Sequence, residues 1–135
     1  MSISWYSLDR NLHTVDHESI TLDQANQIID GYFARLQPQY ESGEDALAAT
    51  MFGFRRPDGS YMQICIHARD MIDIEYDFSL VRNPLLRLVS GRNQRDERLT
   101  SPDSLNARTK LFFEESRENF QRRLREDHAL LPDSW

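Results

Sequence analysis

The chain has 135 residues, of which 39% are hydrophobic and 28% charged, a composition typical of a globular domain rather than a disordered segment. No apolar run approaches the ~20 residues of a membrane-spanning helix, and the first residues lack the basic and apolar regions of a secretory signal. A single cysteine, Cys65, excludes an internal disulfide framework and a cysteine-based zinc site. These properties predict one cytoplasmic domain over residues 1–135, with no membrane association.

The charge is distributed unevenly along the chain. The net charge of −6 is made of −8 in residues 1–80, with thirteen acidic and five basic residues, and +2 in residues 81–135, with nine acidic and eleven basic residues. An acidic surface repels nucleic acid and attracts basic proteins. We therefore expect a protein partner and no nucleic-acid partner.

A strand followed by a helix is predicted at the N-terminus. Residues 2–8 are rich in aromatic and β-favouring types and predict a strand, whereas residues 9–20 are polar and predict an irregular segment. Thr21 begins a capping box, Thr-Leu-Asp-Gln, at the start of a helix. Apolar residues at helical spacing continue to Leu36, and Pro38 ends the helix.

An antiparallel meander of three strands is predicted next. The strands are expected at residues 46–55, 61–68 and 71–78, and the turn Pro57-Asp58-Gly59-Ser60 joins the first two. Residues 83–89 predict either a fourth strand or a short turn of helix.

Residues 90–100 predict a charged loop. Arg92, Arg95 and Arg98 in this loop are candidates for binding an anion, but Asp96 and Glu97 interrupt them. Because the chain is also acidic overall, a solvated loop is the favoured interpretation.

A final helix is predicted from Ser101, a good N-cap, followed by Pro102 at the first helical position. Its apolar residues recur on one face as far as Leu124. The order of elements predicts an α+β fold, in which a single antiparallel sheet, a three- to five-stranded meander, packs against an N-terminal and a C-terminal helix. The opposite face of the sheet is then left to solvent or to a partner.

The strand at residues 71–78 carries the candidate binding surface. Almost perfect alternation places three carboxylates on one face of this strand, and if the registers of the hairpin align, three side chains of the preceding strand share that face. These candidate partner-binding residues are Asp73, Glu75, Asp77, Tyr61, Gln63 and His67.

Three interpretations of this acidic row are open. The simplest is the solvated face of an amphipathic strand, and the sharper one is a docking surface for a basic protein, with tyrosine as an anchor. The third is a Mg²⁺ or Ca²⁺ site. Carboxylates about 7 Å apart along a strand rarely converge without loop ligands, so we predict no metal.

No catalytic site is recognisable in the sequence. Cys65 and His67 are close in sequence, but they have no third orienting group or oxyanion loop. His13 and His17 have the spacing of two zinc ligands, but the glutamate of the H-E-x-x-H motif is missing and the segment predicts a polar loop or short helix. Nucleotide-binding and nucleophile-elbow motifs are also missing. We predict that the protein is not an enzyme and needs no cofactor.

Three segments carry a resemblance to a known class of proteins. They are Phe52–Ile64, Ile72–Tyr76, and a late helix that starts at Ser101-Pro102 and contains the pair Phe112-Phe113. In this arrangement the chain resembles small bacterial immunity proteins of polymorphic and contact-dependent toxin systems. The resemblance extends over about two-thirds of the chain. It implies an acidic, cytoplasmic α+β protein that neutralises a cognate toxin by occluding its active site, with an acidic surface that mimics or blocks an anionic substrate.

Two other functions stay open at this point. One is an acidic secretion chaperone for an effector. Such chaperones are often dimeric, so a homodimer is also a possible state of this chain. The other is a small α+β enzyme with a ligand pocket.

Overall fold

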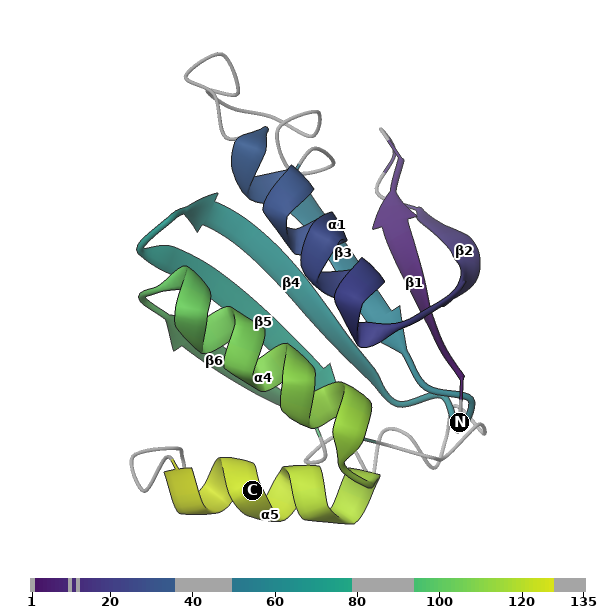
Figure 1. The fold of residues 1–135 in the computed structure, drawn as a ribbon, viewed down its shortest axis with the longest axis vertical. Helices are drawn as coiled ribbons and strands as arrows, with labels where there is room; N and C mark the ends of the chain where they lie inside the picture. The colour runs from purple at the N-terminus through teal and green to yellow at the C-terminus, as the bar shows by residue number, and fades with distance from the viewer. Residues whose placement is uncertain (1, 10, 12, 36–49, 79–93, 128–135) are drawn as a thin grey trace.

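The computed structural model describes residues 2–9, 11, 13–35, 50–78 and 94–127, and in this part of the chain six strands and three helices form an α+β fold (Figure 1). The strands make one antiparallel sheet in the order β2-β1-β3-β4-β5-β6. Their bounds are β1 Ile3–Leu8, β2 Thr14–Ile20, β3 Met51–Arg55, β4 Tyr61–Ala68, β5 Met71–Asp77 and β6 Gln94–Leu99. The helices are α1 Leu22–Ala34, α4 Pro102–Glu114 and α5 Arg117–Asp127.

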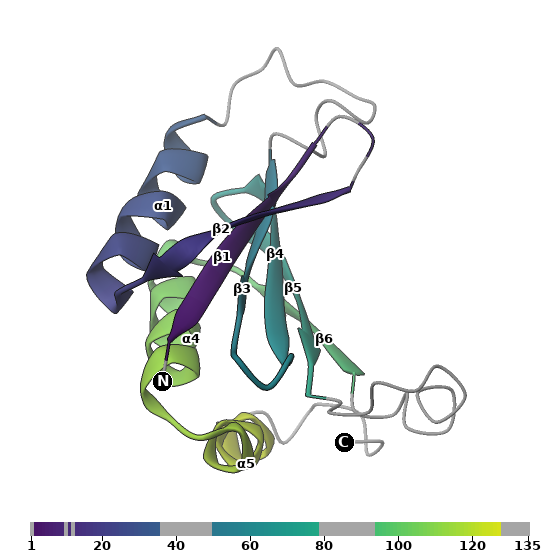
Figure 2. The same cartoon turned by 90° about the vertical axis from the view of Figure 1, so that its right-hand side faces the viewer.

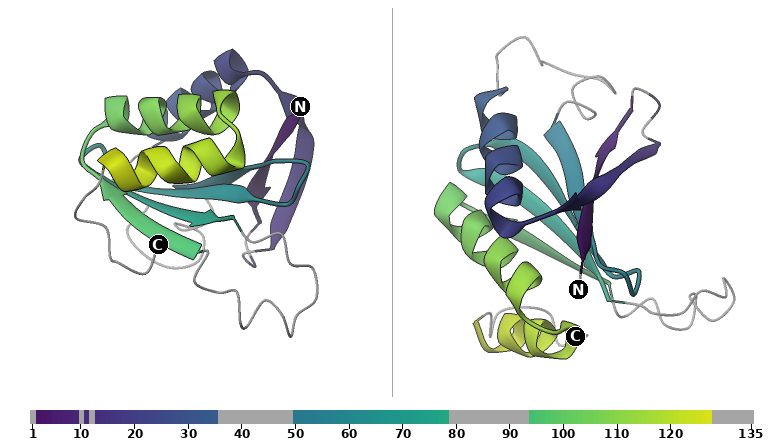
Figure 3. Two further views of the ribbon diagram at one scale, coloured as in Figure 1. Left: turned by 90° about the horizontal axis from the view of Figure 1, so that it is seen from below. Right: turned by 45° about the vertical axis from the view of Figure 1, so that its right-hand side comes forward.

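The helices lie on one side of the sheet (Figures 2 and 3). The predicted α+β class and the single antiparallel sheet are therefore confirmed. The predicted arrangement matches only roughly, because the sheet has six strands rather than three to five and the C-terminal helix is divided in two. No helix in the described ranges is long and apolar enough to cross a membrane.

The predicted capping box fixes the start of α1. The Thr21 hydroxyl accepts a hydrogen bond from the Gln24 amide at 3.2 Å, and the Gln24 side chain accepts one from the Thr21 amide at 2.9 Å. Both amides would otherwise lack a partner at the helix terminus. The helix ends at Ala34, and the predicted continuation to Leu36 and Pro38 lies outside the described residues.

The predicted meander is present as β3, β4 and β5. The bounds of β4 agree with the prediction, and β5 ends one residue earlier than expected. Gly59 adopts a φ of 94° in the turn between β3 and β4, where a side chain would be strained. The Asp58 carboxylate accepts hydrogen bonds from the amide and the hydroxyl of Ser60, which closes the turn. The predicted residues 46–49 and 83–89 lie outside the described part of the chain.

Two segments predicted as irregular are edge strands of the sheet. β2 was expected to be a polar loop or short helix, but it pairs along its length with β1. β6 was expected to be a charged loop, but it pairs with β5 from Gln94 to Leu99. Apolar alternation is weak in both because an edge strand has fewer neighbours to pack against, so the backbone ladder decides the structure.

The predicted final helix begins as expected and then breaks. The Ser101 hydroxyl accepts a hydrogen bond from the Ser104 amide at 3.2 Å, but α4 stops at Glu114 and α5 starts at Arg117. The guanidinium of Arg56 binds the end of α4: Nη2 donates to the carbonyl of Phe112 at 2.7 Å and to that of Glu115 at 3.1 Å. Arg56 thus satisfies carbonyls that the helix leaves free.

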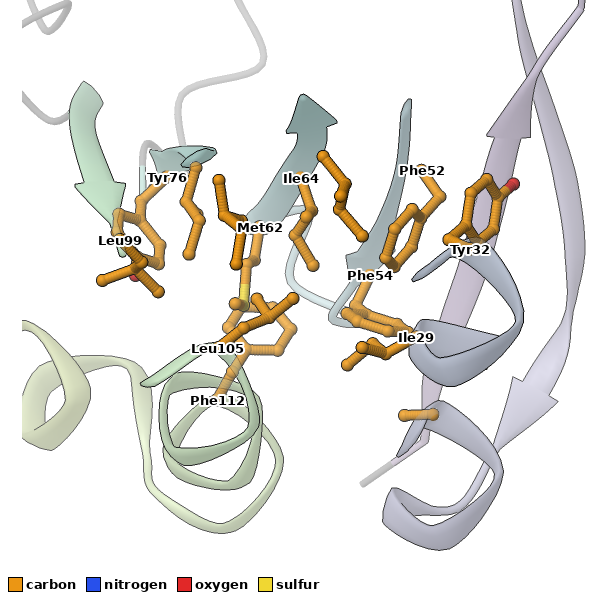
Figure 4. Packing of buried hydrophobic residues seen from close by; sticks show 14 of the residues in the cluster. Ile29, Tyr32, Phe52, Phe54, Met62, Ile64, Tyr76, Leu99, Leu105 and Phe112 are labelled. Carbon is orange, nitrogen blue, oxygen red and sulfur yellow. The ribbon is translucent and has the colours of Figure 1, made fainter. Parts of the chain in front are cut away.

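The hydrophobic core lies between the sheet and the helices (Figure 4). Alternate side chains of the central strands point toward α1 and α4, where they meet Ile29, Tyr32, Leu105 and Phe112. The helix α5 closes one end of this core with Phe120, whose ring contacts the rings of Tyr76 and Phe78. Because the three described helices all pack on this one face, the opposite face is left for a functional role.

A buried polar network joins β6 to the core. The Tyr76 hydroxyl donates to Oε2 of Glu97 at 2.7 Å, and Nη2 of Arg108 lies 3.1 Å from Oε1 of Glu97. All three side chains are buried. A buried carboxylate needs such partners, so the network holds this edge strand against α4.

Candidate functional site

The face of the sheet opposite the helices carries the polar side chains of the central strands. We call it the open face, because within the described ranges no helix packs against it (Figure 2). Strand pairing places Tyr61 opposite Asp77, and Gln63 opposite Glu75. His67 reaches the same face, where its Nε2 lies 2.9 Å from Oδ2 of Asp73. The structure therefore places all six predicted side chains on one face of the sheet, with Tyr61 and His67 toward opposite ends of β4.

The acidic row on this face is not the free anionic surface that the alternation predicted. The Asp73 carboxylate binds Nε and Nη2 of Arg98 at 2.7 and 3.0 Å, and it also contacts His67. The hydrogen bond from Arg98 is the main reason that the pKa of Asp73 lies below its ordinary value, and the bond from His67 adds to it. Asp77 is only 1% exposed. Of the three carboxylates, Glu75 alone is both accessible and without an ion pair to a described residue.

A groove of about 450 Å³ lies on this face. It spans β3 to β6 and is hereafter called the sheet groove. Its volume falls in the range of ligand pockets, roughly 300 to 1,000 Å³. Its lining includes Met51, Gln63, Cys65, Glu75, Asp96 and Arg98.

Glu75 and Asp96 are neighbours in the sheet groove. They are directly paired across β5 and β6, and like charges in that relation repel each other. The pKa of Glu75 is raised above its ordinary value, mainly by partial burial and then by the charges of Asp96 and Asp77. No described cation pairs with either carboxylate. Arg98, on the same strand as Asp96, is already bound to Asp73.

Asp96 and Arg98 were not among the candidate partner-binding residues, and Arg98 was considered only as part of an anion-binding loop. They were assigned to a loop, because Gln94–Leu99 holds a single apolar residue and gives no alternation to indicate a strand. The acidic row of β5 could have indicated these residues, because a row of carboxylates is stabilised by a neighbouring strand that carries cations. Pairing with β5 brings Arg98 opposite Asp73 and Asp96 opposite Glu75.

Tyr6 lies on the open face beside Gln63, a residue that lines the sheet groove. Its ring lies over Gly53, and its hydroxyl donates to Oε1 of Gln63 at 3.0 Å. The guanidinium of Arg55 lies 4.9 Å from the centre of the Tyr6 ring and 3.0 Å from Asp16. Around Tyr6 the polar and charged groups therefore contact one another, whereas Glu75 and Asp96, on β5 and β6, have no cation among the described residues.

The thiol of Cys65 is not arranged for nucleophilic catalysis. Burial is the main cause of a pKa above its ordinary value, and the charge of Asp73 adds to the shift. Its described polar neighbour is Thr50, whose hydroxyl lies 3.9 Å from the sulfur, whereas His67 is bound to Asp73 instead. A protonated thiol without a base is a weak nucleophile. No group of three or more metal-ligating side chains occurs among the residues that the structure describes.

The two N-terminal histidines that share zinc-ligand spacing do not converge. His17 stacks on Trp5 with ring centres 4.0 Å apart, and its Nε2 lies 2.8 Å from the Ser7 hydroxyl. His13 lies 3.9 Å from the Asp9 carboxylate. In the described part of the chain no carboxylate contacts His17, so the pair of Ser7 and His17 lacks the third group that orients a catalytic histidine.

Comparisons with known proteins give no relative for this arrangement. No protein-family model matches the chain, and no curated protein or solved structure gives a significant match. The function must therefore be inferred from the chemistry of the open face.

Proposed function

We propose that this chain is an immunity protein, which binds a cognate bacterial toxin through the open face and occludes the active site of that toxin. The observation that carries the proposal is the pair formed by Glu75 and Asp96 in the sheet groove. These carboxylates repel each other, and no described cation neutralises them. An arrangement that costs stability in the free protein is explained if a basic surface of a partner compensates it.

The mechanism follows from electrostatics. Toxins that act on nucleic acid or other anionic substrates carry basic active sites, and an acidic surface both competes with the substrate and accelerates the encounter. The net charge of −6 adds a long-range attraction to the local one. Since salt screens such attraction over a Debye length of about 8 Å at physiological ionic strength, association should slow as salt concentration rises.

The structure determines which substitutions test the surface. Reversing Asp77 would bury a lysine, and reversing Asp73 would break its bonds to Arg98 and His67, so both changes would disturb the fold. Glu75→Lys and Asp96→Lys change the unpaired charges with less structural cost. Asp30→Lys provides a matched control, because Asp30 is an exposed acid on α1, on the other side of the sheet.

The test begins with affinity capture from the native bacterial strain, using the wild type and these three variants. A partner retained by the wild type and Asp30→Lys, but lost by Glu75→Lys and Asp96→Lys, is then expressed in a sensitive host. Neutralisation predicts growth arrest by the partner alone and recovery on co-expression with the wild type. A captured partner that leaves growth unaffected contradicts neutralisation and favours a secretion chaperone instead.

A further inference from the structure

The sheet groove combines features that suit one type of side chain. Its lining includes the apolar or weakly polar side chains of Met51 and Cys65, and it also holds the carboxylates of Glu75 and Asp96. A long side chain with an apolar stem and a charged head matches both parts, since such side chains pack their methylene groups on apolar surface while the charge stays at a polar rim.

Among the described residues, no cation compensates the carboxylates of Glu75 and Asp96 in the groove. Arg98 is held by two hydrogen bonds to Asp73, and His67 is bound to the same carboxylate. If Arg98 turned toward Asp96, Asp73 would lose its two hydrogen bonds from the guanidinium. The charge of Arg98 is therefore not available to Glu75 and Asp96. The two negative charges at Glu75 and Asp96, which no described cation offsets, are charges that a cation of a partner would neutralise.

The geometry favours a guanidinium over an ammonium group. Side chains paired directly across antiparallel strands have Cβ atoms about 4.5 to 5.5 Å apart, and the planar fork of arginine can donate to two acceptors at once. The Oε1 atom of Gln63 accepts one hydrogen bond from Tyr6, and a carbonyl oxygen has a second lone pair for another donor. The same face already holds one guanidinium, that of Arg98, in a bidentate contact with a carboxylate.

We infer that the sheet groove binds one arginine side chain of the protein partner, with the guanidinium between Glu75 and Asp96 and the stem against Met51 and Cys65. This inference rests on the proposed function in taking the occupant to be part of a protein. It goes further in naming the residue type that is recognised and the point on the sheet where it enters.

The test is an NMR titration of the intact chain with N-acetyl-arginine amide. The expected result is saturable shifts of the backbone amides around Glu75 and Asp96 at millimolar probe concentrations, as for a single side chain lacking its protein context. The matched probes are N-acetyl-citrulline amide, which has the same shape without the charge, and N-acetyl-lysine amide. Citrulline amide should give no saturable shifts, and lysine amide should bind more weakly than arginine amide.

Substitutions assign the shifts to the groove. Glu75→Gln and Asp96→Asn should each weaken the binding of arginine amide about tenfold or more, the factor expected when one hydrogen bond to a charged group is lost. Asp30→Asn, on the helix side, should bind as the wild type does. Peak positions far from the groove show whether each variant keeps its fold.

Four results would overturn the inference: no saturable shifts with arginine amide, equal binding of citrulline amide, equal binding of lysine amide, or unchanged affinity in Glu75→Gln and Asp96→Asn. These outcomes are separable from the proposed function. Toxin binding that is lost in Glu75→Lys without any binding of arginine amide leaves neutralisation standing and removes the arginine pocket. Binding of arginine amide by a chain that neutralises no toxin does the reverse.

Discussion

Tyr6 and Gly53 provide the sharpest test of the packing beside the sheet groove. A Cβ atom built on Gly53 would lie 2.3 Å from Cζ and from the hydroxyl oxygen of Tyr6, whereas carbon atoms make favourable contact at about 3.5 to 4.0 Å. In Gly53→Ala the buried ring must therefore move by more than about 1 Å. Gly53 has no left-handed backbone conformation, so the contact with Tyr6 is the obstacle.

Three contributions set the size of the effect. Overpacking of this kind costs about 1 to 3 kcal/mol, and loss of the Tyr6–Gln63 hydrogen bond costs about 0.5 to 1.5 kcal/mol. Replacement of glycine by alanine returns about 0.4 to 1 kcal/mol through the lower entropy of the unfolded chain. We expect Gly53→Ala to lower the free energy of unfolding by about 1 to 3 kcal/mol.

The assay is urea denaturation, followed by far-ultraviolet circular dichroism, of the wild type, Gly53→Ala, Tyr6→Leu and the double variant. When the tyrosine ring is absent, the alanine meets no obstacle, so Gly53→Ala should stabilise Tyr6→Leu by about 0.4 to 1 kcal/mol. The sign of the alanine effect thus reverses between the two backgrounds. An equal loss in both, or no loss in the wild type, would refute the claim that Tyr6 rests on Gly53.

Three further predictions concern stability. Tyr76→Phe removes the buried hydrogen bond to Glu97 and should cost about 1.5 to 3 kcal/mol in urea denaturation; a loss below about 0.5 kcal/mol would mean that the bond contributes little. The pKa of Glu75 is raised above its ordinary 4.5, so the folded protein holds this proton more tightly than the unfolded chain, and ionisation costs stability as pH rises through that region. Glu75→Gln should therefore gain on the wild type between about pH 4 and pH 7, by about 0.2 to 1 kcal/mol, whereas parallel stability curves would contradict the cause assigned to the shift. Ser101→Ala should cost about 1 kcal/mol in thermal unfolding and Ser101→Gly only a few tenths; equal losses would argue against the hydroxyl as the cap of α4.

The parts of the fold that were predictable are those fixed by local chemistry. The capping box at Thr21 and the proline after Ser101 specify helix starts within a few residues, and both starts are found where expected. β4 alternates strictly between core and open face, so its bounds were predicted without error. The shared face of the six candidate binding residues followed from the same alternation.

The parts that were missed depend on long-range pairing. β6 contains only one apolar side chain, so it has no alternating pattern that indicates a strand. It is a strand because the chain returns to the edge of β5 and pairs with it, which a local sequence pattern does not predict. At the break between α4 and α5, two carbonyls are bound by Arg56, which is distant in the sequence. Because β6 was not predicted, the positions of Asp96 and Arg98 beside β5 were not predicted either. The ion pair between Arg98 and Asp73, and the pairing of Glu75 with Asp96, therefore did not follow from the sequence.

The contact between Arg56 and the end of α4 affects how the protein can fold during synthesis on the ribosome. Arg56 is 2% exposed in the folded chain, yet the carbonyl of Glu115 that it binds is synthesised 59 residues later. The hairpin of β3 and β4 can form early, but its cation must stay hydrated until α4 has left the exit tunnel. Closure of the core around Arg56 therefore comes only after Glu115 has been synthesised, and chains truncated before Glu115 should be more sensitive to proteases.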